Sequence, residues 1–299
     1  MSIVVNGLSK VYGQQKAIDD ISFSAEKGQI IGLLGPNGAG KTTTMKILTC
    51  YMPPTSGTAT LSGLEIGKDD HEIKKLIGYL PEHNPLYGTM YVKEYLRFVE
   101  RVHKLPRNAN RIPALIDRVG LTIESNKKIG QLSKGYRQRV GIAQALIHEP
   151  EILILDEPIS GLDPNQLVEI RALISELKKD KTVIFSSHIL QEVESISDKI
   201  IILDKGRIVA DDALSNLASK SSNNTVISIE LLNDISEEIL RKVSGVQNVQ
   251  KVESKSFVLD SNFDNREQIF DTVAASGNKL LGMKAVSYTH LTLPTICSV

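Results

Sequence analysis

The chain has 299 residues, of which 41% are hydrophobic and 23% charged, as expected of a folded protein with one large domain or two smaller ones. Basic and acidic residues both number 35, so the formal net charge is zero, which argues against a nucleic acid as the main partner. The two cysteines, Cys50 and Cys297, lie far apart without a CxxC spacing, which excludes a disulfide framework and favours a reducing compartment. No signal peptide is recognisable and no apolar run is long enough to cross a bilayer, so we expect a cytoplasmic protein that reaches a membrane only through a partner.

The first part of the chain is expected to alternate short strands and turns around one glycine-rich loop. Strand patterns cover residues 2–12 and 17–24, and the apolar run Ile30–Leu34 leads directly into the loop. A helix over Thr42–Cys50 follows the loop and ends before Pro53. Three shorter segments come next: a strand at Thr60–Ser62, a helix at His71–Leu76 and an extended run at Gly78–Leu80.

The glycine-rich loop matches G-x-x-x-x-G-K-[ST] at every fixed position, with a strand before it and a helix after it, as this motif requires. The residues expected to hold phosphate are Gly35, Pro36, Asn37, Gly38, Ala39, Gly40, Lys41, Thr42 and Thr43. Glycines let the backbone point several N–H groups at one anion, and the helix behind the loop adds its positive dipole end. Lys41 would reach the outer phosphates, and the Thr42 hydroxyl would bind Mg²⁺. The alternative is a simple glycine-rich turn, which the matching context makes the weaker interpretation.

The pattern then becomes helical, which predicts a helical insert over about residues 85–148. Apolar residues recur at helical spacing through Val92–Val102 and again through Ile112–Val119, where Gly120 is a stop signal. Strands are expected next at Ile152–Leu155, Thr182–Ser186, Lys199–Leu203 and Ile208–Ala210, and helices at Leu167–Lys178 and Leu190–Ile196. This order predicts an α/β core that carries a helical insert.

A polar stretch, Ser219–Asn224, is interpreted as a linker, so the first domain is expected to span residues 1–218. A small α+β domain is expected over residues 219–285, in the order βαββαβ of split-βαβ folds. Its strands are expected at 225–231, 246–252, 257–259 and 279–283, and its helices at 236–243 and 266–275.

Residues 286–299 do not continue this pattern. They contain no charged residue apart from a possible charge on His290, and they resemble the translation of a transposase sequencing adaptor. We therefore expect this tail to be non-native, with the natural C-terminus missing. The alternative is a genuine apolar tail that docks on the small domain.

Two adjacent carboxylates, Asp156 and Glu157, end the wholly apolar strand Ile152–Leu155. Ligands of open α/β sheets bind at the carboxyl ends of strands. We expect Asp156 to hold Mg²⁺ opposite Thr42, and Glu157 to take a proton from an attacking water. The alternative is that two acidic residues simply end a strand. This interpretation is weaker because the same chain carries a phosphate-loop motif.

With these motifs the chain resembles the ATP-binding-cassette ATPases, the nucleotide-binding subunits of ABC transporters, over about residues 2–215. The resemblance implies an α/β fold of P-loop NTPase type with an antiparallel β subdomain and a helical subdomain, and it implies ATP and Mg²⁺ as cofactors. Tyr12 falls where the family stacks an aromatic ring on adenine, although a tyrosine at a strand end is the simpler alternative.

The segment Leu132–Tyr136 stands at the LSGGQ signature of this family. Ser133 and Gly135 are kept, whereas Lys134 and Tyr136 depart from the family pattern. The resemblance implies that the Ser133 hydroxyl, the Gly135 N–H and the following helix hold a γ-phosphate. Without the family, the same residues would indicate only a helix cap.

Three more residues are assigned through the resemblance. Asp163 lies in the D-loop, and His188, just after the strand at 182–186, matches the switch histidine that contacts the γ-phosphate. A lone histidine is more often structural. Glu82 stands where the family's Q-loop has glutamine, and its carboxylate could bind Mg²⁺ or its water. The extra negative charge could tighten metal binding or alter coupling to the membrane partner.

The family arrangement also implies partners. Two cassettes sandwich two ATP molecules head to tail, so a second ABC ATPase subunit is needed, which we expect to be a second copy of this chain. Closing of the dimer would pass through residues 82–91 and the helical insert to integral membrane permease subunits, on the inner face of the cell membrane. The Q-loop variant, the signature variant and the appended domain are most similar to exporter-type cassettes of multidrug and bacterial gliding-motility systems.

Two other classes of function remain as alternatives. A non-transport cassette in DNA repair would need long coiled coils, and one acting on ribosomes usually carries two cassettes and a basic character; neither pattern is present. A module that only senses ATP is disfavoured because Lys41, Asp156, Glu157 and His188 are all intact.

Overall fold

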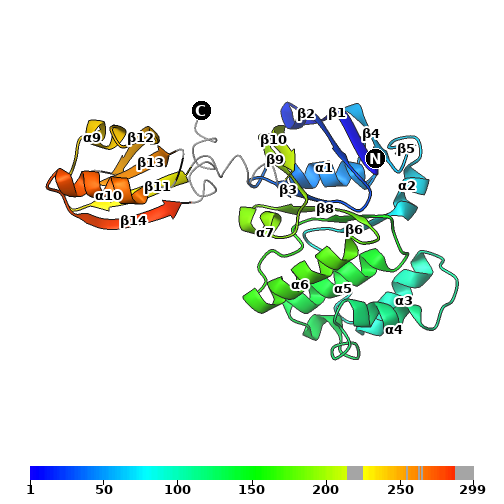
Figure 1. The fold of residues 1–299 in the computed structure, drawn as a ribbon. Helices are drawn as coiled ribbons and strands as arrows, with labels where there is room; N and C mark the ends of the chain where they lie inside the picture. The colour runs from blue at the N-terminus through cyan, green and yellow to red at the C-terminus, as the bar shows by residue number, and fades with distance from the viewer. Residues whose placement is uncertain (214–224, 254, 262, 264, 287–299) are drawn as a thin grey trace. The chain divides into compact units, whose positions relative to one another are not determined.

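The computed structural model describes residues 1–213, 225–253, 255–261, 263 and 265–286 (Figure 1). It divides the chain into two units, Met1–Leu214 and Ser215–Val299, and each unit has a hydrophobic core of its own. The predicted linker Ser219–Asn224 and the tail after Val286 lie outside the described residues, so both remain predictions.

A six-stranded sheet forms the centre of the first unit. Its strands, in spatial order, are β10 (Arg207–Ala213), β9 (Lys199–Asp204), β3 (Ile30–Leu34), β8 (Thr182–Ser187), β7 (Ile152–Leu155) and β6 (Ile77–Leu80). All neighbours are parallel except β10, which runs antiparallel to β9. Strands β3, β7 and β8 are buried along their whole length, because layers cover both faces of the sheet. Burial on both faces explains why these strands are continuous apolar runs in the sequence.

An antiparallel sheet of four strands packs over one face of this centre. Its order is β2 (Gln15–Ala25), β1 (Ile3–Tyr12), β4 (Ser56–Leu61) and β5 (Leu64–Glu65). Helix α1 (Lys41–Leu48) lies between the two sheets, and one hydrophobic cluster joins all three (Figure 1). Strand β4 is longer than the predicted Thr60–Ser62 because its first half pairs with β1, and the sequence analysis missed β5. Two residues are too few to show a pattern.

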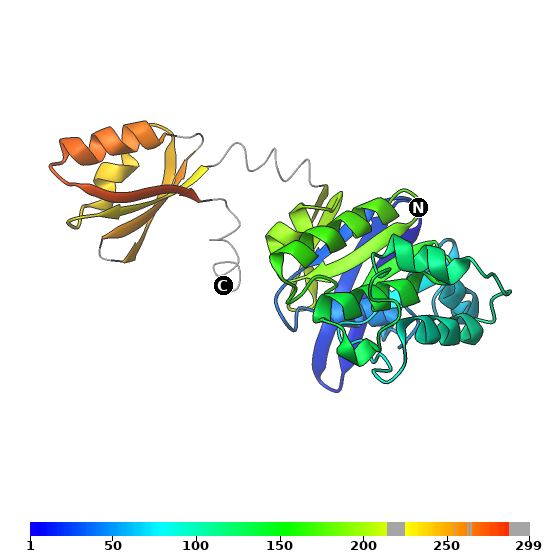
Figure 2. The ribbon, with the colours of Figure 1, turned by 90° about the horizontal axis from the view of Figure 1, so that it is seen from below.

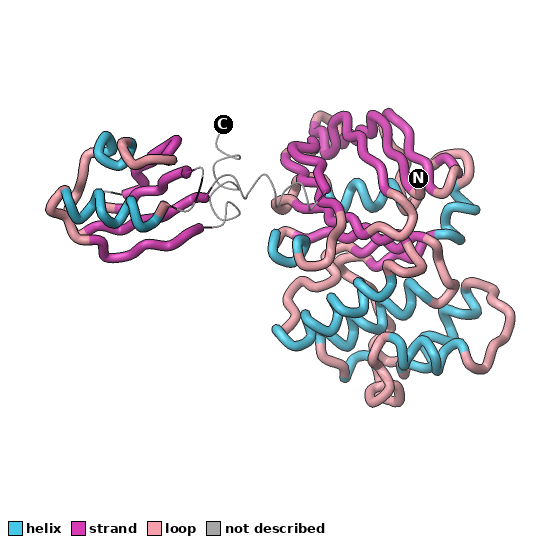
Figure 3. The backbone as a smooth tube through the Cα atoms, viewed as in Figure 1, coloured by secondary structure: helices cyan, strands magenta, loops and turns pink. Residues whose placement is uncertain are grey.

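Helices cover the opposite face of the six-stranded sheet (Figures 2 and 3). Besides α2 (Asp70–Leu76) and α7 (Leu190–Glu194), the first unit contains α3 (Val92–Val102), α4 (Arg111–Arg118), the short 3₁₀ helix η1 (Ile129–Gln131), α5 (Lys134–Leu146) and α6 (Pro164–Leu177). Helix α3 buries Val92, Tyr95, Leu96 and Val99, one face at helical spacing. Helix α6 begins three residues before the predicted Leu167, because the Asp163 side chain caps it and Pro164 is tolerated in its first turn.

The described residues of the second unit form four strands and two helices in the predicted order. These are β11 (Thr225–Leu231), α9 (Glu237–Arg241), β12 (Val246–Glu253), β13 (Ser256–Ser261), α10 (Arg266–Ala275) and β14 (Leu280–Val286). The sheet order is β12-β13-β11-β14, with every neighbouring pair antiparallel. Alternate residues of β11, Ile227, Ile229 and Leu231, share a core with Leu240 of α9 and Ile269 of α10, so both helices cover the same face of the sheet.

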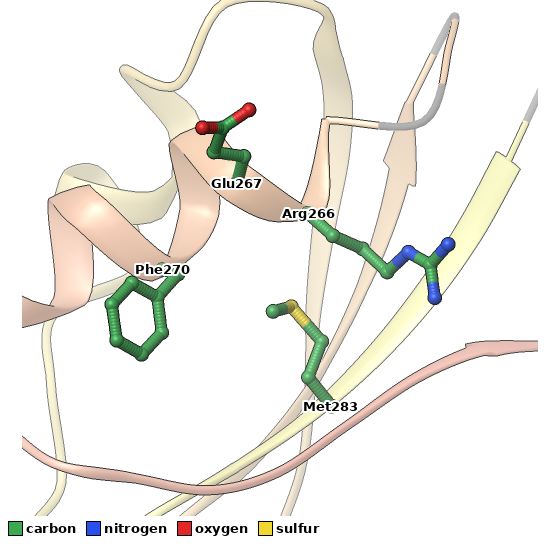
Figure 4. A pocket seen from close by; sticks show the side chains of 4 residues that line it. All are labelled: Arg266, Glu267, Phe270 and Met283. Atoms are coloured by element: carbon green, nitrogen blue, oxygen red, sulfur yellow. The ribbon is translucent and has the colours of Figure 1, made fainter.

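A cavity of about 580 Å³ lies between α10 and β14 of this unit (Figure 4). It is lined by Arg266, Glu267, Phe270 and Met283; Phe270 and Met283 approach each other from the helix and the strand, and Glu267 points away. Phe270 is half exposed, and the lining groups include no set of side chains arranged for catalysis.

Across the described parts of both units, no helix combines the length and the apolar character that crossing a membrane requires.

Candidate functional site

A cavity of about 550 Å³ lies at the carboxyl ends of strands of the six-stranded sheet. It is lined by Tyr12, Gln15, Ala17, Pro36, Asn37, Gly38, Ala39, Gly40, Lys41, Thr42, Thr43, Glu82, Glu157, Ser160 and His188. Strands β3, β6, β7 and β8 are parallel, so the segments that follow them meet at one edge of the sheet. The phosphate loop, Glu82, Glu157 and His188 are thereby brought together, although up to 153 positions separate Gly35 from His188 in the chain. Gln15, Ala17 and Ser160 also line the cavity and were not identified from the sequence.

The phosphate loop needs its glycines for both conformation and space. Gly40 has φ 106°, and a Cβ there would lie 2.7 Å from the carbonyl oxygen of Ala17. A Cβ on Gly35 would lie 2.3 Å from the carbonyl oxygen of Leu203. Helix α1 begins directly after Gly40 and has no acidic residue in its first turn, so nothing in that turn cancels the positive end of the helix. The loop and helix together are suited to an anion.

The Lys41 amino group is almost fully buried and lies over its own loop. Nζ donates hydrogen bonds to the carbonyl oxygens of Gly35 at 2.7 Å and Pro36 at 3.2 Å. The same atom lies 3.7 Å from Oε1 of Glu157. A single flexible side chain therefore holds a positive charge between the loop backbone and the carboxylate opposite.

Asp156 is fully buried at the end of β7. Its Oδ1 accepts a 2.6 Å hydrogen bond from the Ser186 hydroxyl, whereas Oδ2 has no hydrogen-bond partner among the described residues. A buried carboxylate oxygen without a partner is costly unless a cation or donor completes it. Mg²⁺ commonly takes only one or two carboxylates and fills its shell with water and substrate phosphates. The single available carboxylate fits such an ion, and the described residues contain no cluster of three or more metal-binding side chains.

Ser186 connects the Asp156 carboxylate with the backbone of Glu157 and was not identified from the sequence. Its hydroxyl donates to Asp156 and accepts a 2.8 Å hydrogen bond from the backbone N–H of Glu157. It comes from β8, which neighbours β7 in the sheet. A serine near the end of an otherwise apolar strand was the available signal, but its target depends on which strand lies alongside.

Glu157 adopts a left-handed backbone conformation, with φ 51°, immediately after the strand. This conformation costs energy for a residue with a side chain, of order 1 kcal/mol or more. It turns the carboxylate back toward the phosphate loop and His188, whose Nδ1 lies 3.1 Å from Oε2. Burial raises the pKa of the Glu157 carboxyl, and the nearby His188 and Lys41 partly oppose that shift. The result is a carboxylate that accepts a proton more readily than an exposed glutamate.

Tyr12 and Glu82 lie at the margins of the cavity. Tyr12 is 47% exposed; its hydroxyl lies 2.9 Å from the sulfur of Met52, and the Lys10 amino group is 5.5 Å from its ring centre. Glu82 follows β6 and its side chain is half exposed, with Nδ1 of His83 at 3.9 Å from Oε1. Both residues are therefore open to a ligand in the cavity.

Ser133, Gly135 and Asp163 do not line this cavity. Ser133 caps α5 and accepts from the Tyr136 N–H at 3.4 Å, and Asp163 caps α6 and accepts from the Gln166 N–H at 2.9 Å. Gln166, which the sequence analysis missed, joins these two caps because its Nε2 donates to the Ser133 hydroxyl at 3.3 Å.

The contact is close on both sides of that hydrogen bond. A Cβ on Gly135 would lie 2.2 Å from Oε1 of Gln166, and a Cβ on Gly161 would lie 2.4 Å from Nζ of Lys134. The signature segment and the segment around Asp163 therefore pack against each other within one chain. The spacing of Asp163 and Gln166, typical of a capping box, was the signal that could have indicated Gln166.

Comparisons with known proteins agree with this geometry. The family model described as "ABC transporter" matches residues 18–160. The linearmycin resistance ATP-binding protein LnrL of Bacillus subtilis (strain 168) is 36% identical over 248 residues, which cover 82% of this chain and 79% of that protein. The bacitracin transport ATP-binding protein BcrA of Bacillus licheniformis is 38% identical over 221 residues, 73% of this chain and 72% of that protein.

Solved structures show the same fold. A dimeric ATP-binding cassette, bound to ADP and Pi in a post-hydrolysis state, has 25% sequence identity and a TM-score of 0.65. The match covers 71% of this chain and 98% of that one. The similarity to the two curated relatives exceeds 30% identity across more than two thirds of their length. The α/β P-loop fold predicted from the sequence is thus confirmed, and the chain belongs to the ATP-binding proteins of ABC transporters, a family of ATP-binding-cassette ATPases.

Proposed function

We propose that this chain binds and hydrolyses ATP as the nucleotide-binding subunit of an exporter, and that it works with a separate membrane permease. The observation that carries the hydrolytic role is the position of Glu157, held between Lys41 and His188 at the cavity of the phosphate loop. Two relatives, named as a linearmycin resistance protein and a bacitracin transport protein, support the transport role and are in keeping with removal of a compound from the cell.

ATP would bind with its phosphates on the loop of residues 35–43. Backbone N–H groups and the open end of α1 would take the negative charge, and the Lys41 amino group would leave its loop carbonyls for the outer phosphates. Tyr12, half exposed at the margin of the same cavity, would stack on the adenine ring.

Mg²⁺ would be held by the Thr42 hydroxyl and Asp156, directly or through water, with Glu82 as a further oxygen ligand. The partnerless Oδ2 of Asp156 supports this assignment. When bound, the ion would neutralise charge on the phosphates. Ser186 would keep the other oxygen of Asp156 in place.

Glu157 would take the proton of the attacking water, because its carboxylate is buried, basic and directed into the cavity. His188 would orient that carboxylate and contact the γ-phosphate end of ATP. Lys41 would stabilise the charge that develops on the phosphates during cleavage. The Glu157 backbone N–H is fixed by Ser186, which holds the base in its strained conformation.

A second copy of the chain would complete the site. Ser133 and Gly135 lie away from the cavity of their own chain and offer a hydroxyl, an N–H and the start of α5 to a neighbouring molecule. We therefore propose a head-to-tail homodimer in which these groups reach the γ-phosphate bound by the partner. Asp163, linked to Ser133 through Gln166, would connect the two sites.

The permease would dock beside the Glu82 segment, on the inner face of the membrane. Tyr87 and Phe98 are 52% and 40% exposed. The centre of the Tyr87 ring lies 5.6 Å from that of Phe98 and 5.9 Å from that of Tyr95 on α3. Exposed aromatic rings that cluster in this way mark protein interfaces. Tyr87 of this cluster lies five residues after Glu82, so contact there would be coupled to the cavity. In the same proposal residues 1–218 form the ATPase domain, with the helical insert at about 85–148, and residues 219–285 form an accessory domain.

The proposal is tested in two steps with the full chain. Purified protein should hydrolyse ATP in a Mg²⁺-dependent reaction; an ATP-binding protein without turnover would indicate a sensor instead. Extraction of membranes with mild detergent should recover a multi-spanning protein with the tagged chain. Replacing Tyr87 and Phe98 by serine should abolish that recovery and leave soluble ATP turnover within about twofold. Recovery that is unchanged in this variant would place the permease elsewhere.

A further inference from the structure

A second polar cavity, of about 660 Å³, lies on the helical part of the first unit. It is formed by helix α3 and the segment that leads into α4, which lie side by side in Figure 1. Its lining residues are Lys93, Arg97, Glu100, Arg101, Leu105, Arg107, Asn108, Ala109, Ile112 and Pro113. It shares no residue with the cavity of the phosphate loop. Four of the ten lining side chains are cationic and one is anionic, in a chain whose net charge is zero.

Helical spacing places three of these cations on one face. Lys93, Arg97 and Arg101 are each four residues apart along α3, so they form a row about two turns long. Arg107 faces the same cavity from the segment between the helices. Like charges at this spacing repel one another and destabilise a helix. Among the described residues, no contact of these side chains offsets that repulsion apart from one hydrogen bond of Lys93.

The acidic groups of α3 are already engaged elsewhere. Glu100, the carboxylate at the cavity, is bound to Arg111 at 2.7 Å, and both side chains are only 15% exposed. Glu94 accepts from the Tyr91 N–H at 3.2 Å at the start of the helix. No carboxylate is therefore left on α3 to neutralise the row.

The cavity cations themselves are largely without partners. Arg97, Arg101 and Arg107 make no side-chain hydrogen bond or ion pair within the part of the chain that the structure describes. Lys93 donates only to the neutral amide of Asn126, at 2.9 Å. Three guanidinium groups can thus offer their forked donors to one ligand, a geometry suited to phosphate oxygens.

Besides its cations, the cavity is lined by Glu100, Asn108 and four apolar residues. Ile112 is 7% exposed, and the other three are Leu105, Ala109 and Pro113. An ordinary solvated row of charges stands on a convex helix surface, whereas this row lines one side of a hollow that also presents apolar side chains. A small ion alone would leave that lining unused, so an anion with an attached organic part fits better.

We propose that this cavity binds a phosphate-bearing anion, such as a lipid headgroup or a soluble phosphate compound. The cations would bind the phosphate, and the apolar lining would contact the adjoining carbon atoms. The site is independent of ATP hydrolysis, because neither its residues nor its charges take part in the cavity of the phosphate loop.

The test compares two full-length variants that remove the same charge. Arg97→Gln/Arg101→Gln removes two cations from the cavity. Lys27→Gln/Lys179→Gln removes two exposed cations that line none of the described cavities and have no side-chain partner among the described residues. Flotation with vesicles of phosphatidylcholine and phosphatidylglycerol in equal parts measures headgroup binding, with pure phosphatidylcholine as the blank. Calorimetric titration with inorganic pyrophosphate measures binding of a soluble phosphate compound and the number of sites. The number is needed because the phosphate loop is expected to supply one site of its own.

With a lipid source, the unmodified chain floats with the anionic vesicles, and the Arg97→Gln/Arg101→Gln variant binds about 30-fold more weakly while the lysine control changes little. With a soluble source, two pyrophosphate sites fall to one in the same arginine variant. Binding should also weaken as salt is raised. The proposal is overturned if neither probe binds outside the phosphate loop, or if both variants lose binding equally, since that would indicate general charge attraction. Unchanged ATP turnover in the arginine variant shows that it is folded.

Discussion

The two motif regions of the first unit differ in how much of their chemistry one chain supplies. Around the phosphate loop, Lys41, Asp156, Glu157 and His188 are held by short contacts among three segments of the fold: the loop itself, the end of β7 and the end of β8. Around the signature, Ser133 and Asp163 are bound only to helix N–H groups and to Gln166. The first region is a buried and nearly complete site. The second is a preformed surface that, in the proposed dimer, would meet the ligand bound by a partner.

This difference separates the groups that set the chemistry of the site from the groups that would respond to a partner. A buried network can tune a base, as burial does for Glu157. A surface held by two helix caps presents its groups to the outside, and in the proposed dimer it would act when a partner approaches. Variants of the first region should therefore impair a single chain, whereas variants of the second should impair only the pair.

The largest effect is expected for Lys41→Ala. It removes the buried cation from the phosphate cavity, so ATP binding should be lost and turnover should fall by about 100-fold or more. Equilibrium binding of a fluorescent ATP analogue and a phosphate-release assay measure both. Lys46→Ala, from the last turn of the same helix, is the control and should bind normally. Normal turnover in Lys41→Ala would refute the whole site.

Glu157→Gln should separate binding from chemistry. The amide keeps the shape of the side chain but cannot take a proton, so turnover should fall by about 10² to 10⁴ while ATP still binds. Because ATP persists, a dimer should accumulate, which light scattering with ATP and Mg²⁺ can detect. Glu194→Gln makes the same change at a residue that does not line the cavity, so this control should behave as the unmodified chain. Normal turnover in Glu157→Gln would remove this residue from the role of base.

The same variant should reveal the raised pKa of Glu157 through stability. The folded pKa lies above 4.5, the ordinary value for a glutamate, so the folded state holds the proton more tightly than the unfolded state. The free energy of unfolding of the unmodified chain should therefore fall, relative to the Gln variant, as pH rises from 4.5 through the folded pKa. Urea unfolding across this range, without nucleotide or Mg²⁺, measures the difference. A difference that does not change with pH would mean that His188 and Lys41 cancel the burial of the carboxylate.

Ser133→Ala should distinguish the two regions most directly. It removes one hydroxyl from the signature, so turnover should fall by about 10-fold to 100-fold if that hydroxyl binds a partner's phosphate. ATP affinity measured on dilute, single chains should stay unchanged, because Ser133 does not line the cavity of its own chain. A loss of affinity in the single chain would break the comparison between the regions.

The smallest effect is expected for Gln166→Ala. It deletes the hydrogen bond to Ser133, so the stability should fall by about 1 kcal/mol and turnover by a few fold through a less ordered signature. The effect on turnover should vanish in a Ser133→Ala background, since the two residues act through one contact. Additive effects in that double-mutant cycle would show that Gln166 acts elsewhere.

The regular elements could be predicted where one physical cause dominates. The buried strands β3 and β7 are continuous apolar runs, and α3 has one apolar face, so sequence periodicity located them. Strand β5 and the first half of β4 could not be found, because pairing with neighbouring strands, and not their own composition, makes them strands. Linear motifs predicted the phosphate loop and both carboxylates. Ser186 and Gln166 were not predicted, because the residues that they contact come from other segments of the chain.

Residue types at fixed short spacings were enough to identify the α/β class and the family and to predict phosphate binding. The arrangement of the groups became visible only in the folded chain. Parallel strands bring the loop and Glu157 to one edge while Ser133 stays outside it. A row of cations on α3 lines one side of a hollow. Distances between segments depend on how the sheet and helices pack, which local spacing does not encode.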